Sequence, residues 1–406
     1  MADALEFEGR RVRVHQGDTV ASALVRDGVL TFTRSLKYHR RRAPYCLTGD
    51  CPNCLVNVDG EPGVRACTTE AREGQVVRRE AGWPSPEHDL LHVTDHLHPL
   101  FPIGFYSKTF IRPRFAWRWA EAVIRRATGV GRLPLGRAPR IGPARTLHAD
   151  VVVVGAGVAG LAAAGEAASQ GERVVVLDEG RLGEKVWDPV VIERIEALAA
   201  SARADGAEIL ERHTAVGVYE GPFVPAFGPG GAVHIEARRV IVATGAVEAH
   251  AVFPGNDLPG VFLARGAGRL AGRHSVAPGR RAALVATTEE GRATAEVLRA
   301  AGTEVVVVDG TVVAAEGTRR VKAVVVDTPA GRERIACDTL VLSLGWAPRD
   351  ALLRMATADE AVGAGEVVTP GCSLDEAEVG GRRAAGGAGP TPVPVPTVPM
   401  GAGGYV

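Results

Sequence analysis

Residues 46–54 read Cys46-Leu-Thr-Gly-Asp-Cys51-Pro-Asn-Cys54, and Cys67 follows after twelve more residues. The whole chain of 406 residues contains six cysteines, so four of them gather in this one stretch. The spacing C-x4-C-x2-C, followed by a more distant cysteine, is the plant-type pattern for holding a [2Fe–2S] cluster through thiolate ligands. The stretch therefore predicts a cluster bound by Cys46, Cys51, Cys54 and Cys67, and a small domain built around that loop.

Two alternatives to a cluster are open. A structural zinc ion usually takes two C-x2-C-like pairs, and only Cys51 and Cys54 form one here. Disulfides are typical of small secreted domains, but the N-terminal sequence MADALEFEGRRVRV lacks the apolar stretch of a signal peptide. The spacing favours the cluster, with zinc as the main alternative.

The overall composition is that of an ordinary globular protein. Hydrophobic residues make up 46% and charged residues 23% of the chain, and 47 basic residues balance 47 acidic ones. This balance gives no reason to expect nucleic acid or an anionic membrane surface as a partner. No apolar run approaches the ~18 residues of a transmembrane segment. We therefore expect a cytoplasmic protein whose thiols are kept reduced.

Residues 1–85 predict a β-grasp-like domain around the cysteines. Two short strands come first, and a helix that Asp18 or Thr19 caps follows them. Residues 55–60 then alternate apolar and polar side chains into a turn, and residues 64–67 return as a strand. The cluster is expected under a loop between these strands.

A basic run at residues 32–42 comes directly before the first cysteine. It is interpreted either as a solvated loop or as positive charge beside an anionic iron–sulfur centre, where it would raise the reduction potential or dock an anionic group. His39 in this run and His250 further on are candidate functional histidines, although an isolated histidine is more often structural.

Residues 86–147 form a long connection with a helix-like stretch at residues 114–127 and a spacer rich in Gly, Pro and Arg. A loop of this length is seldom without a role in a compact protein. We expect it to lie across another domain or subunit, with a mobile linker as the alternative. The aromatic side chains that it would bury are Phe105, Tyr106, Phe110, Trp117 and Trp119.

A dinucleotide-binding fingerprint begins at residue 151. Residues 151–154 are all valine, which is typical of a strand buried on both faces of a parallel sheet. The glycine turn at residues 155–160 opens an alanine-rich helix, and a second strand ends at Asp178-Glu179. Such glycines let the backbone approach a pyrophosphate at the helix N-terminus, and the acid accepts hydrogen bonds from an adenosine ribose. An unliganded turn is the alternative. The predicted binding residues are Gly155, Gly157, Val158, Ala159, Gly160 and Asp178, or Glu179 beside it.

Residues 281–310 look like a second strand–helix–strand unit, with Ala286-Thr-Thr-Glu-Glu-Gly291 at its phosphate turn. Side chains there, including two carboxylates, would obstruct and repel a pyrophosphate. This part is therefore expected to keep the fold and to have lost or altered nicotinamide binding.

The order of these motifs resembles the family of sarcosine oxidase α subunits, which includes subunits of hydrogen cyanide synthase, opine oxidase and dye-linked proline dehydrogenases. The resemblance covers residues 5–385, and it implies an α/β fold: an N-terminal β-grasp ferredoxin-like domain followed by a Rossmann-type two-dinucleotide-binding-domain flavoprotein of the thioredoxin-reductase kind. The segments that carry it are SLKYHRRRAPYC at 35–46, WPSPEHDL at 83–90, GFYSKTF at 104–110, GAGVAGLAAA at 155–164 and VVVLDE at 174–179.

The resemblance also implies cofactors and domain limits. FAD is expected at the fingerprint, with NAD or ATP as alternatives, and Thr244-Gly245 beside the flavin nucleotide. The implied divisions are 1–85 (2Fe–2S domain), 86–147 (connecting segment), 148–260 (first part of the FAD domain), 261–336 (inserted nicotinamide-type domain), 337–385 (second part of the FAD domain) and 386–406 (disordered tail).

The chain departs from the family pattern in several places. Many sarcosine oxidase α subunits lack the cluster cysteines, and this chain has them. A late Gly-Asp pair usually touches the flavin ribityl, and we take Gly371-Cys372 to stand in its place. The chain stops short of the folate-binding half, so we expect no tetrahydrofolate reaction. Cys337 and Cys372 are isolated, and without a C-x-x-C pair beside the flavin halves disulfide reduction is not expected.

Together these features predict an electron-transfer subunit of a multi-subunit amine or amino-acid oxidoreductase of the sarcosine, opine, proline or glycine class. No catalytic constellation stands out in the chain, so substrate oxidation is expected on an FAD-dependent β subunit, with FMN at a subunit interface as a further cofactor. A stand-alone NAD(P)H-dependent iron–sulfur flavoprotein reductase is one alternative. A non-catalytic nucleotide-binding scaffold subunit is the other.

Overall fold

The computed structural model describes residues 3–97, 112, 114–128, 131, 142–356 and 360–387. The chain folds into two compact units. Of the described residues, one unit combines those from 3 to 131 with residues 250–343, and the other combines residues 142–249 with those from 344 to 387. The tail predicted to be disordered comprises residues 386–406, and its part after Gly387 lies outside the described residues.

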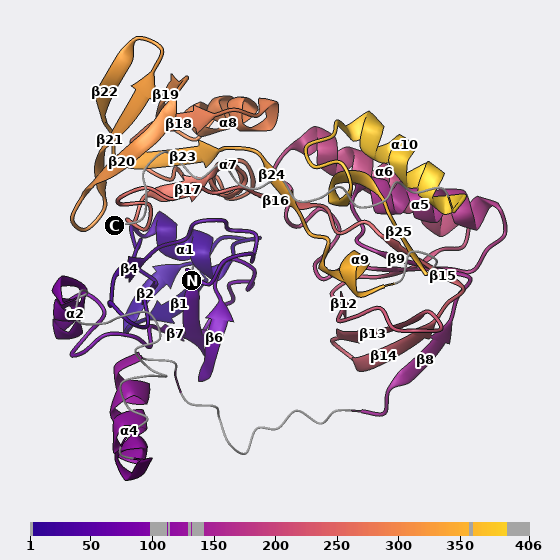
Figure 1. The fold of residues 1–406 in the computed structure, drawn as a ribbon, viewed down its shortest axis with the longest axis horizontal. Coiled ribbons are helices and arrows are strands. Elements are labelled where there is room, and N and C mark those ends of the chain that lie inside the picture. Colours follow the sequence, from indigo (N-terminus) through magenta and orange to yellow (C-terminus); the bar gives the residue numbers. More distant parts are fainter. Residues whose placement is uncertain are drawn as a thin grey trace. The chain divides into compact units, whose positions relative to one another are not determined.

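The first unit begins with a five-stranded sheet in the order β2-β1-β7-β5-β6 (Figure 1). The pairs are antiparallel except for β1 and β7, which run parallel. The return strand predicted at residues 64–67 is wrong in its limits, because the chain turns at Ala66 toward the first helix, where the Ala21 N–H donates to the Ala66 carbonyl. Cys67 therefore lies outside the sheet. The strands are β1 (Ala4–Phe7), β2 (Arg10–Arg13), β5 (Leu55–Val58), β6 (Glu61–Arg65) and β7 (Val76–Arg78).

Helix α1 (Val20–Arg26) begins where the sequence predicts it. The Thr19 side chain accepts the Ser22 N–H, and the Ser22 side chain accepts the Thr19 N–H, which forms a capping box. Six of the seven helical residues are buried. The helix is therefore a core element of the first unit.

The basic run at residues 32–42 is partly buried. Its ends pair as strands β3 (Thr33–Arg34) and β4 (Arg41–Arg42). Between them, the buried Asp89 Oδ2 lies 2.8 Å from His39 Nδ1 and 3.8 Å from Arg34 Nε. The solvated-loop interpretation is wrong for Arg34 and His39, because both side chains contact a buried carboxylate. His39 has a structural role: it holds the segment after Asp89, which continues as the 3-10 helix η1 (Leu90–His92) and helix α2 (Val93–His96).

The long connection contains the 3-10 helix η3 (Arg114–Ala116) and helix α4 (Trp117–Thr128), as the helix-like stretch predicts. Trp117 and Trp119 are 38% and 78% exposed, so the described residues of the first unit leave both side chains accessible. Burial by another domain or subunit stays a prediction. Phe105, Tyr106 and Phe110 lie outside the described residues.

Residues 250–343 complete the first unit with a Rossmann-like layer. Its parallel sheet has the order β17-β23-β18-β19, and β20, β21 and β22 form a separate antiparallel sheet. The predicted strand–helix–strand unit at residues 281–310 is confirmed. The elements are β17 (Val261–Leu263), α7 (Ala264–Gly268), the π-helical turn η4 (Arg269–Arg273), β18 (Arg281–Ala286), α8 (Glu289–Ala300), β19 (Glu304–Val308), β20 (Thr311–Gly317), β21 (Val321–Thr328), β22 (Gly331–Ala336) and β23 (Thr339–Ser343).

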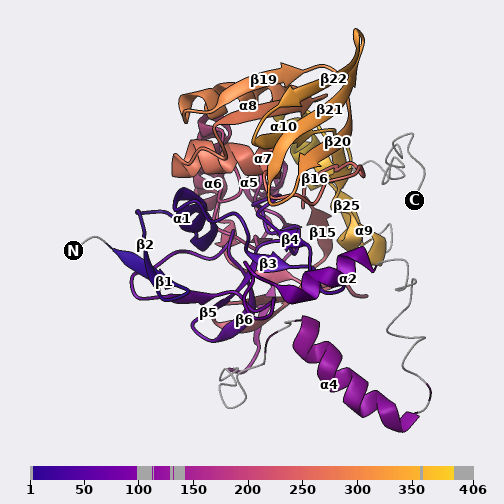
Figure 2. The same cartoon turned by 90° about the vertical axis from the view of Figure 1, so that its left-hand side faces the viewer.

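One hydrophobic core runs through this first unit. It joins Phe7 of β1 and Leu24 of α1 to Phe262 of β17 and Leu270 of η4. Figures 1 and 2 show α1 on the side of the N-terminal sheet that faces β17 and α7. The cysteine-bearing domain and residues 250–343 therefore pack around a common core.

The second unit is built on a parallel sheet in the order β11-β10-β9-β15-β25. Val151 and Val153 pack into a core with three helices, while Val152 and Val154 pack into a core on the opposite face. The valine run is therefore buried on both faces, as predicted. The elements are β9 (Val151–Val154), α5 (Val158–Ser169), β10 (Val174–Leu177), α6 (Pro189–Ala204), β11 (Glu208–Leu210), β15 (Arg239–Val242), β25 (Ala361–Gly363) and α10 (Leu374–Ala385).

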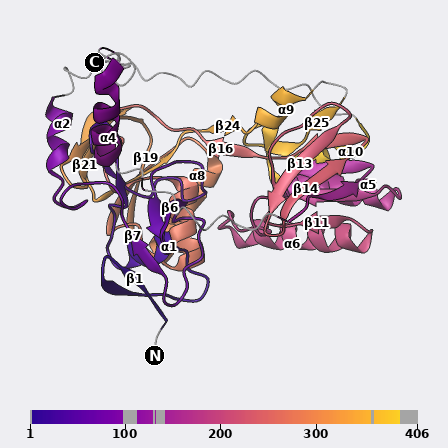
Figure 3. The same cartoon turned by 90° about the horizontal axis from the view of Figure 1, so that it is seen from below.

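A second sheet, in the order β12-β13-β14-β8, covers that opposite face (Figure 1). Strand β8 begins inside the segment predicted as a connection and pairs with β14. Two short strands, β16 (Ala246–Glu248) and β24 (Trp346–Pro348), pair where the chain leaves and re-enters this unit (Figure 3). In the part of the chain that the structure describes, no helix has the length and apolar character to cross a membrane. The remaining elements are β8 (Arg145–His148), β12 (Thr214–Ala215), β13 (Phe223–Gly228), β14 (Gly231–Glu236), α9 (Ala351–Met355) and the 3-10 helix η5 (Gly365–Val367).

Candidate functional site

The cluster loop places its four cysteines at different depths. Cys46, Cys54 and Cys67 are buried, whereas Cys51 is half-buried. The loop takes left-handed backbone at Leu47, with φ of 53°, and again at the glycine two residues later. This turn brings the first two thiols together, with the Sγ atoms of Cys46 and Cys51 3.3 Å apart.

The four thiols form two pairs. Cys46 contacts Cys51, and Cys67 hydrogen-bonds with Cys54. Among the described residues, no three His, Cys, Asp or Glu side chains converge on a single metal position. A [2Fe–2S] cluster divides four thiolates between its two irons. The paired thiols are a donor set of that kind, and Cys46 with Cys51, and Cys54 with Cys67, would each hold one iron.

The pairing also sets the acidity of the thiols. The hydrogen bond between Cys46 and Cys51 lowers the pKa of Cys46 to about 5. The same hydrogen bond raises the pKa of Cys51, and Cys54 raises the pKa of Cys67 in the same way. A cationic metal centre that replaces the shared protons would take the sulfurs as thiolates.

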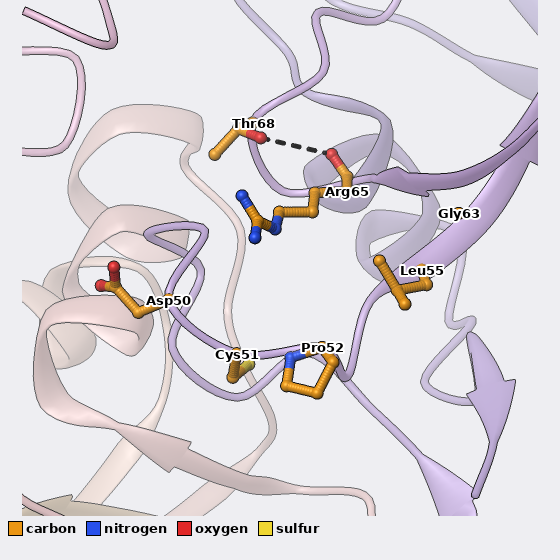
Figure 4. Close-up of a pocket in the computed structure, with 7 residues that line it drawn as sticks. All are labelled: Asp50, Cys51, Pro52, Leu55, Gly63, Arg65 and Thr68. Carbon is orange, nitrogen blue, oxygen red and sulfur yellow. Dashed lines mark hydrogen bonds between the residues drawn. The ribbon is translucent and has the colours of Figure 1, made fainter. Parts of the chain in front are cut away.

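A shallow pocket of about 560 Å³ opens beside the cluster loop (Figure 4). Cys51 is the only one of the four cysteines that lines it. Because Cys51 is also the least buried of the four, the pocket lies on the side where a bound cluster would be nearest to solvent. The lining residues are Asp50, Cys51, Pro52, Leu55, Gly63, Arg65 and Thr68.

The glycine turn after β9 has the close approaches of a dinucleotide fingerprint. A Cβ at Gly155 would lie 2.3 Å from the Ala243 carbonyl oxygen, and one at Gly160 would lie 1.9 Å from the Gly155 oxygen. Gly157, the N-cap of α5, has nothing within 4 Å of its Cβ position. The fold therefore requires Gly155 and Gly160, whereas Gly157 leaves space at the helix N-terminus, where a pyrophosphate would bind.

Asp178 and Glu179 follow β10 at the edge of this turn. The Asp178 carboxylate accepts the Ala156 N–H of the turn at 2.8 Å, and burial raises the pKa of Asp178. Burial also acts to raise the pKa of Glu179, but ion pairs with Lys185 and Arg349 outweigh it and lower the pKa. Asp178 therefore contacts the turn itself, while Glu179 is engaged by two cations.

The other predicted residues line the same edge of the sheet. Val158 and Ala159 are buried residues in the first turn of α5. Thr244 follows β15 and donates its hydroxyl to a backbone carbonyl 2.7 Å away, and Gly245 has φ of 72°. Because β9 and β15 are parallel neighbours, their carboxyl ends bring Gly155 and Thr244 to one edge.

The structure brings Gly365-Glu366 to this turn, whereas the sequence indicated Gly371-Cys372. Gly365 follows β25, and a Cβ there would lie 2.6 Å from the Cβ of Ala159. The Oε2 atom of Glu366 lies 3.8 Å from the Cβ position of Gly245. Gly365-Glu366, rather than Gly371-Cys372, is therefore where a late Gly-Asp pair would be expected. The sequence signal for it is the short apolar stretch immediately before Gly365.

Gly371 and Cys372 have other surroundings. A Cβ at Gly371 would lie 2.5 Å from the Trp346 ring, so the glycine makes room for the indole. Burial, and then Glu366 and Glu376, raise the pKa of Cys372 to about 11. A thiol this weakly acidic is not an activated nucleophile.

The turn before α8 keeps the fold of a nucleotide site but fills its phosphate position. A Cβ at Gly291 would lie 2.3 Å from the Ser343 Cβ, so this glycine is required by packing. Thr288 caps α8 by accepting the Gly291 N–H at 3.0 Å. The Glu290 carboxylate forms a two-point ion pair with Arg265, with N–O distances of 2.9 Å. A pyrophosphate would meet the protein's own carboxylate there.

Comparison with known proteins gives family matches for two parts of the chain. Residues 4–82 match the family "2Fe-2S iron-sulfur cluster binding domain", and residues 149–309 match the family "Pyridine nucleotide-disulphide oxidoreductase". The sarcosine oxidase subunit alpha of Rhizobium meliloti (strain 1021) is 34% identical over 390 residues, which covers 84% of this chain and 39% of that protein. The chain belongs to the sarcosine oxidase α subunit-like family. The predicted family and the predicted 2Fe–2S and flavoprotein-type domains are thereby confirmed.

A second relative, the sarcosine oxidase subunit alpha of Corynebacterium sp. (strain P-1), is 31% identical over 377 residues, or 84% of this chain and 35% of that protein. The chain thus spans little more than a third of the length of these two curated relatives. Among solved structures, L-proline dehydrogenase from P. horikoshii is similar over 95% of this chain and 72% of that chain, with a TM-score of 0.69 and 19% identity. This likeness confirms the predicted α/β fold.

Proposed function

We propose that this chain is the electron-transfer subunit of a multi-subunit amine or amino-acid oxidoreductase, and that it passes electrons between FAD and a [2Fe–2S] cluster. The observation that carries the proposal is the presence of two cofactor sites in one chain: a loop with paired thiols, and a glycine turn at the edge of a parallel sheet. Flavins handle hydride chemistry, and iron–sulfur clusters accept single electrons, so the two together connect two-electron to one-electron transfer.

The residues proposed for each cofactor follow from the two sites. The half-buried Cys51 and the pocket beside it support this side of the loop as the electron exit. The cluster would be held by Cys46, Cys51, Cys54 and Cys67. FAD would be bound by Gly155, Gly157, Val158, Ala159, Gly160, Asp178, Thr244, Gly245 and Glu366, with Glu179 and Gly371 as the remaining sequence candidates.

We place substrate oxidation on a partner, an FAD-dependent amine or amino-acid oxidase-like β subunit, with FMN at the shared interface. The names of the relatives support a hetero-oligomer, because each is called a subunit of an oxidase. Those names also support a substrate of the sarcosine class, with the opine, proline and glycine classes as alternatives. The need to keep four thiols reduced supports a cytoplasmic location.

The main experiment is anaerobic purification of the chain with its partner, followed by absorbance, EPR and nucleotide extraction. We expect a rhombic signal of a reduced [2Fe–2S] cluster and stoichiometric FAD. The variant Cys51→Ser should lose the signal, and Cys337→Ser should keep it, because Cys337 is a buried cysteine outside the loop. Stoichiometric zinc without iron would contradict the cluster. Extraction of NAD or ATP without flavin would favour the scaffold alternative.

The reductase alternative has its own test. The Glu290–Arg265 pair at the start of α8 argues against nicotinamide binding. The purified chain, without its partner, is mixed anaerobically with NADH or NADPH, and we expect no rapid bleaching of flavin or cluster. Bleaching at catalytic rates would establish a stand-alone reductase instead.

A further inference from the structure

An arginine from the inserted residues reaches into the cluster loop. Arg269, the first residue of η4, donates a hydrogen bond from Nη1 to the carbonyl of Leu47, 222 residues earlier in the chain. Leu47 lies in the loop between Cys46 and Cys51, and Arg269 is only 2% exposed. A buried cation thus contacts the backbone of the loop that joins Cys46 to Cys51.

The backbone just before Arg269 fits equally closely against the loop. A Cβ at Gly266 would lie 2.7 Å from the carbonyl oxygen of Cys46 and 2.8 Å from that of Tyr45. The Leu263 N–H donates to the Tyr45 carbonyl at 3.0 Å. Helix α7 therefore packs on the backbone of the first ligand with no room for a side chain, and this fixes the start of η4.

A buried network with α1 fixes the other end of η4. Arg26 donates from Nη2 to Asp18 at 2.9 Å and to the carbonyl of His274 at 2.8 Å. His274 directly follows η4, and its Nδ1 lies 3.8 Å from Asp18 Oδ1. Both ends of the turn that carries Arg269 are thus attached to the cysteine-bearing domain.

We propose that Arg269 is a positioning residue of the [2Fe–2S] centre: it pins the loop between Cys46 and Cys51, and its buried charge raises the reduction potential. The inference rests on the proposed function, because it presupposes the cluster. The reduced form of a cluster carries one more negative charge than the oxidised form, and a fixed cation in a low-dielectric interior favours the more negative form. Residues 250–343 have a nucleotide-type fold whose phosphate position is filled. They thereby form one side of the cluster site.

The test is a redox titration of the full chain with its partner, followed by EPR, on wild type, Arg269→Gln and Arg269→Lys. We expect the midpoint potential of Arg269→Gln to be lower by about 59 mV, which is a tenfold change for a one-electron couple. At the wild-type midpoint potential, the variant should therefore hold about tenfold less reduced than oxidised cluster. Arg269→Lys keeps the charge and should stay closer to wild type in potential and iron content. Arg292→Gln removes the same charge from an exposed position on α8 and should leave the potential unchanged.

The outcomes separate this inference from the proposed function. A wild-type protein without a [2Fe–2S] signal would overturn the proposed function. A wild-type cluster with an unchanged potential in Arg269→Gln would overturn only the role of Arg269. The role is also overturned if Arg269→Lys matches Arg269→Gln in both iron content and potential. If Arg269→Gln fails to hold iron, the iron content of Arg269→Lys decides, and a lysine variant that is equally poor in iron overturns the role.

Discussion

At the scale of single residues, His274 gives the contact between α1 and η4 a defined pH dependence. Burial, and then Arg269, Arg273 and Arg26, lower the pKa of His274 from 6.5 to about 4, while Asp18 acts in the opposite direction. Between these two pH values, the unfolded chain binds a proton that the folded chain excludes. Stability is therefore full above pH 6.5 and falls as the pH is lowered. From pH 7 to pH 5 we expect a loss of about 2 kcal/mol.

Urea unfolding at pH 7 and pH 5 measures this effect. His274→Gln should lose less stability on acidification than wild type, and His250→Gln, at an exposed histidine, should lose as much as wild type. Asp18 does not interfere, because Arg26 and other hydrogen-bond donors outweigh the effect of burial and lower the pKa of Asp18 below 3.8. An equal loss in wild type and His274→Gln would show that this histidine is not the acid-sensitive group.

Residues whose role depends on local spacing were predictable, and residues whose role depends on distant contacts were not. The cysteines lie within one short stretch, so their spacing alone indicates a cluster. Arg269 contacts Leu47 across 222 residues of sequence, and no local pattern distinguishes it from the other arginines. Glu366 was only partly predictable. It follows a short strand, which is a local signal, but the sequence there does not match the expected Gly-Asp pair.

At the scale of elements, the turn before α5 separates a glycine that the fold needs from one that a nucleotide needs. In Gly160→Ala, the methyl group would lie 1.9 Å from the Gly155 oxygen, so backbone must move. We expect a loss of about 1–3 kcal/mol in stability together with loss of nucleotide. In Gly157→Ala, the methyl group meets no protein atom within 4 Å, so stability should be unchanged while flavin content falls.

Thermal unfolding of both variants after flavin removal, and flavin content after purification, measure the two effects. Full flavin occupancy in Gly157→Ala would mean that no phosphate lies at the N-terminus of α5. Unchanged stability of the flavin-free Gly160→Ala protein would contradict the packing role of that glycine.

Elements that carry a strong local pattern, such as β9 and α5, were predicted well. The errors lie where tertiary partners decide the limits of an element. Strand β8 forms because β14 offers a parallel neighbour, and β6 ends at Arg65 because Ala66 turns toward α1. Neither partner is visible in the local sequence.

At the scale of the whole molecule, α4 and the residues just before it carry an exposed apolar stripe. Phe115, Trp119 and Val123 recur at helical spacing and are 77%, 78% and 69% exposed. An exposed stripe of this kind marks a contact surface more often than free surface. The stripe supports the proposal that the connecting segment binds a partner subunit.

Co-expression with the β subunit tests the stripe. Tryptophan at the centre of an interface typically contributes about 2 kcal/mol or more, so Trp119→Ala should weaken the complex by about thirtyfold. Val123→Ser should weaken it less. Val190→Ser on α6, at a valine that is 64% exposed, makes the same chemical change outside the stripe and should leave the complex intact. Co-purification of all three variants at the wild-type ratio, with unchanged dissociation constants, would mean that the β subunit binds elsewhere on the chain.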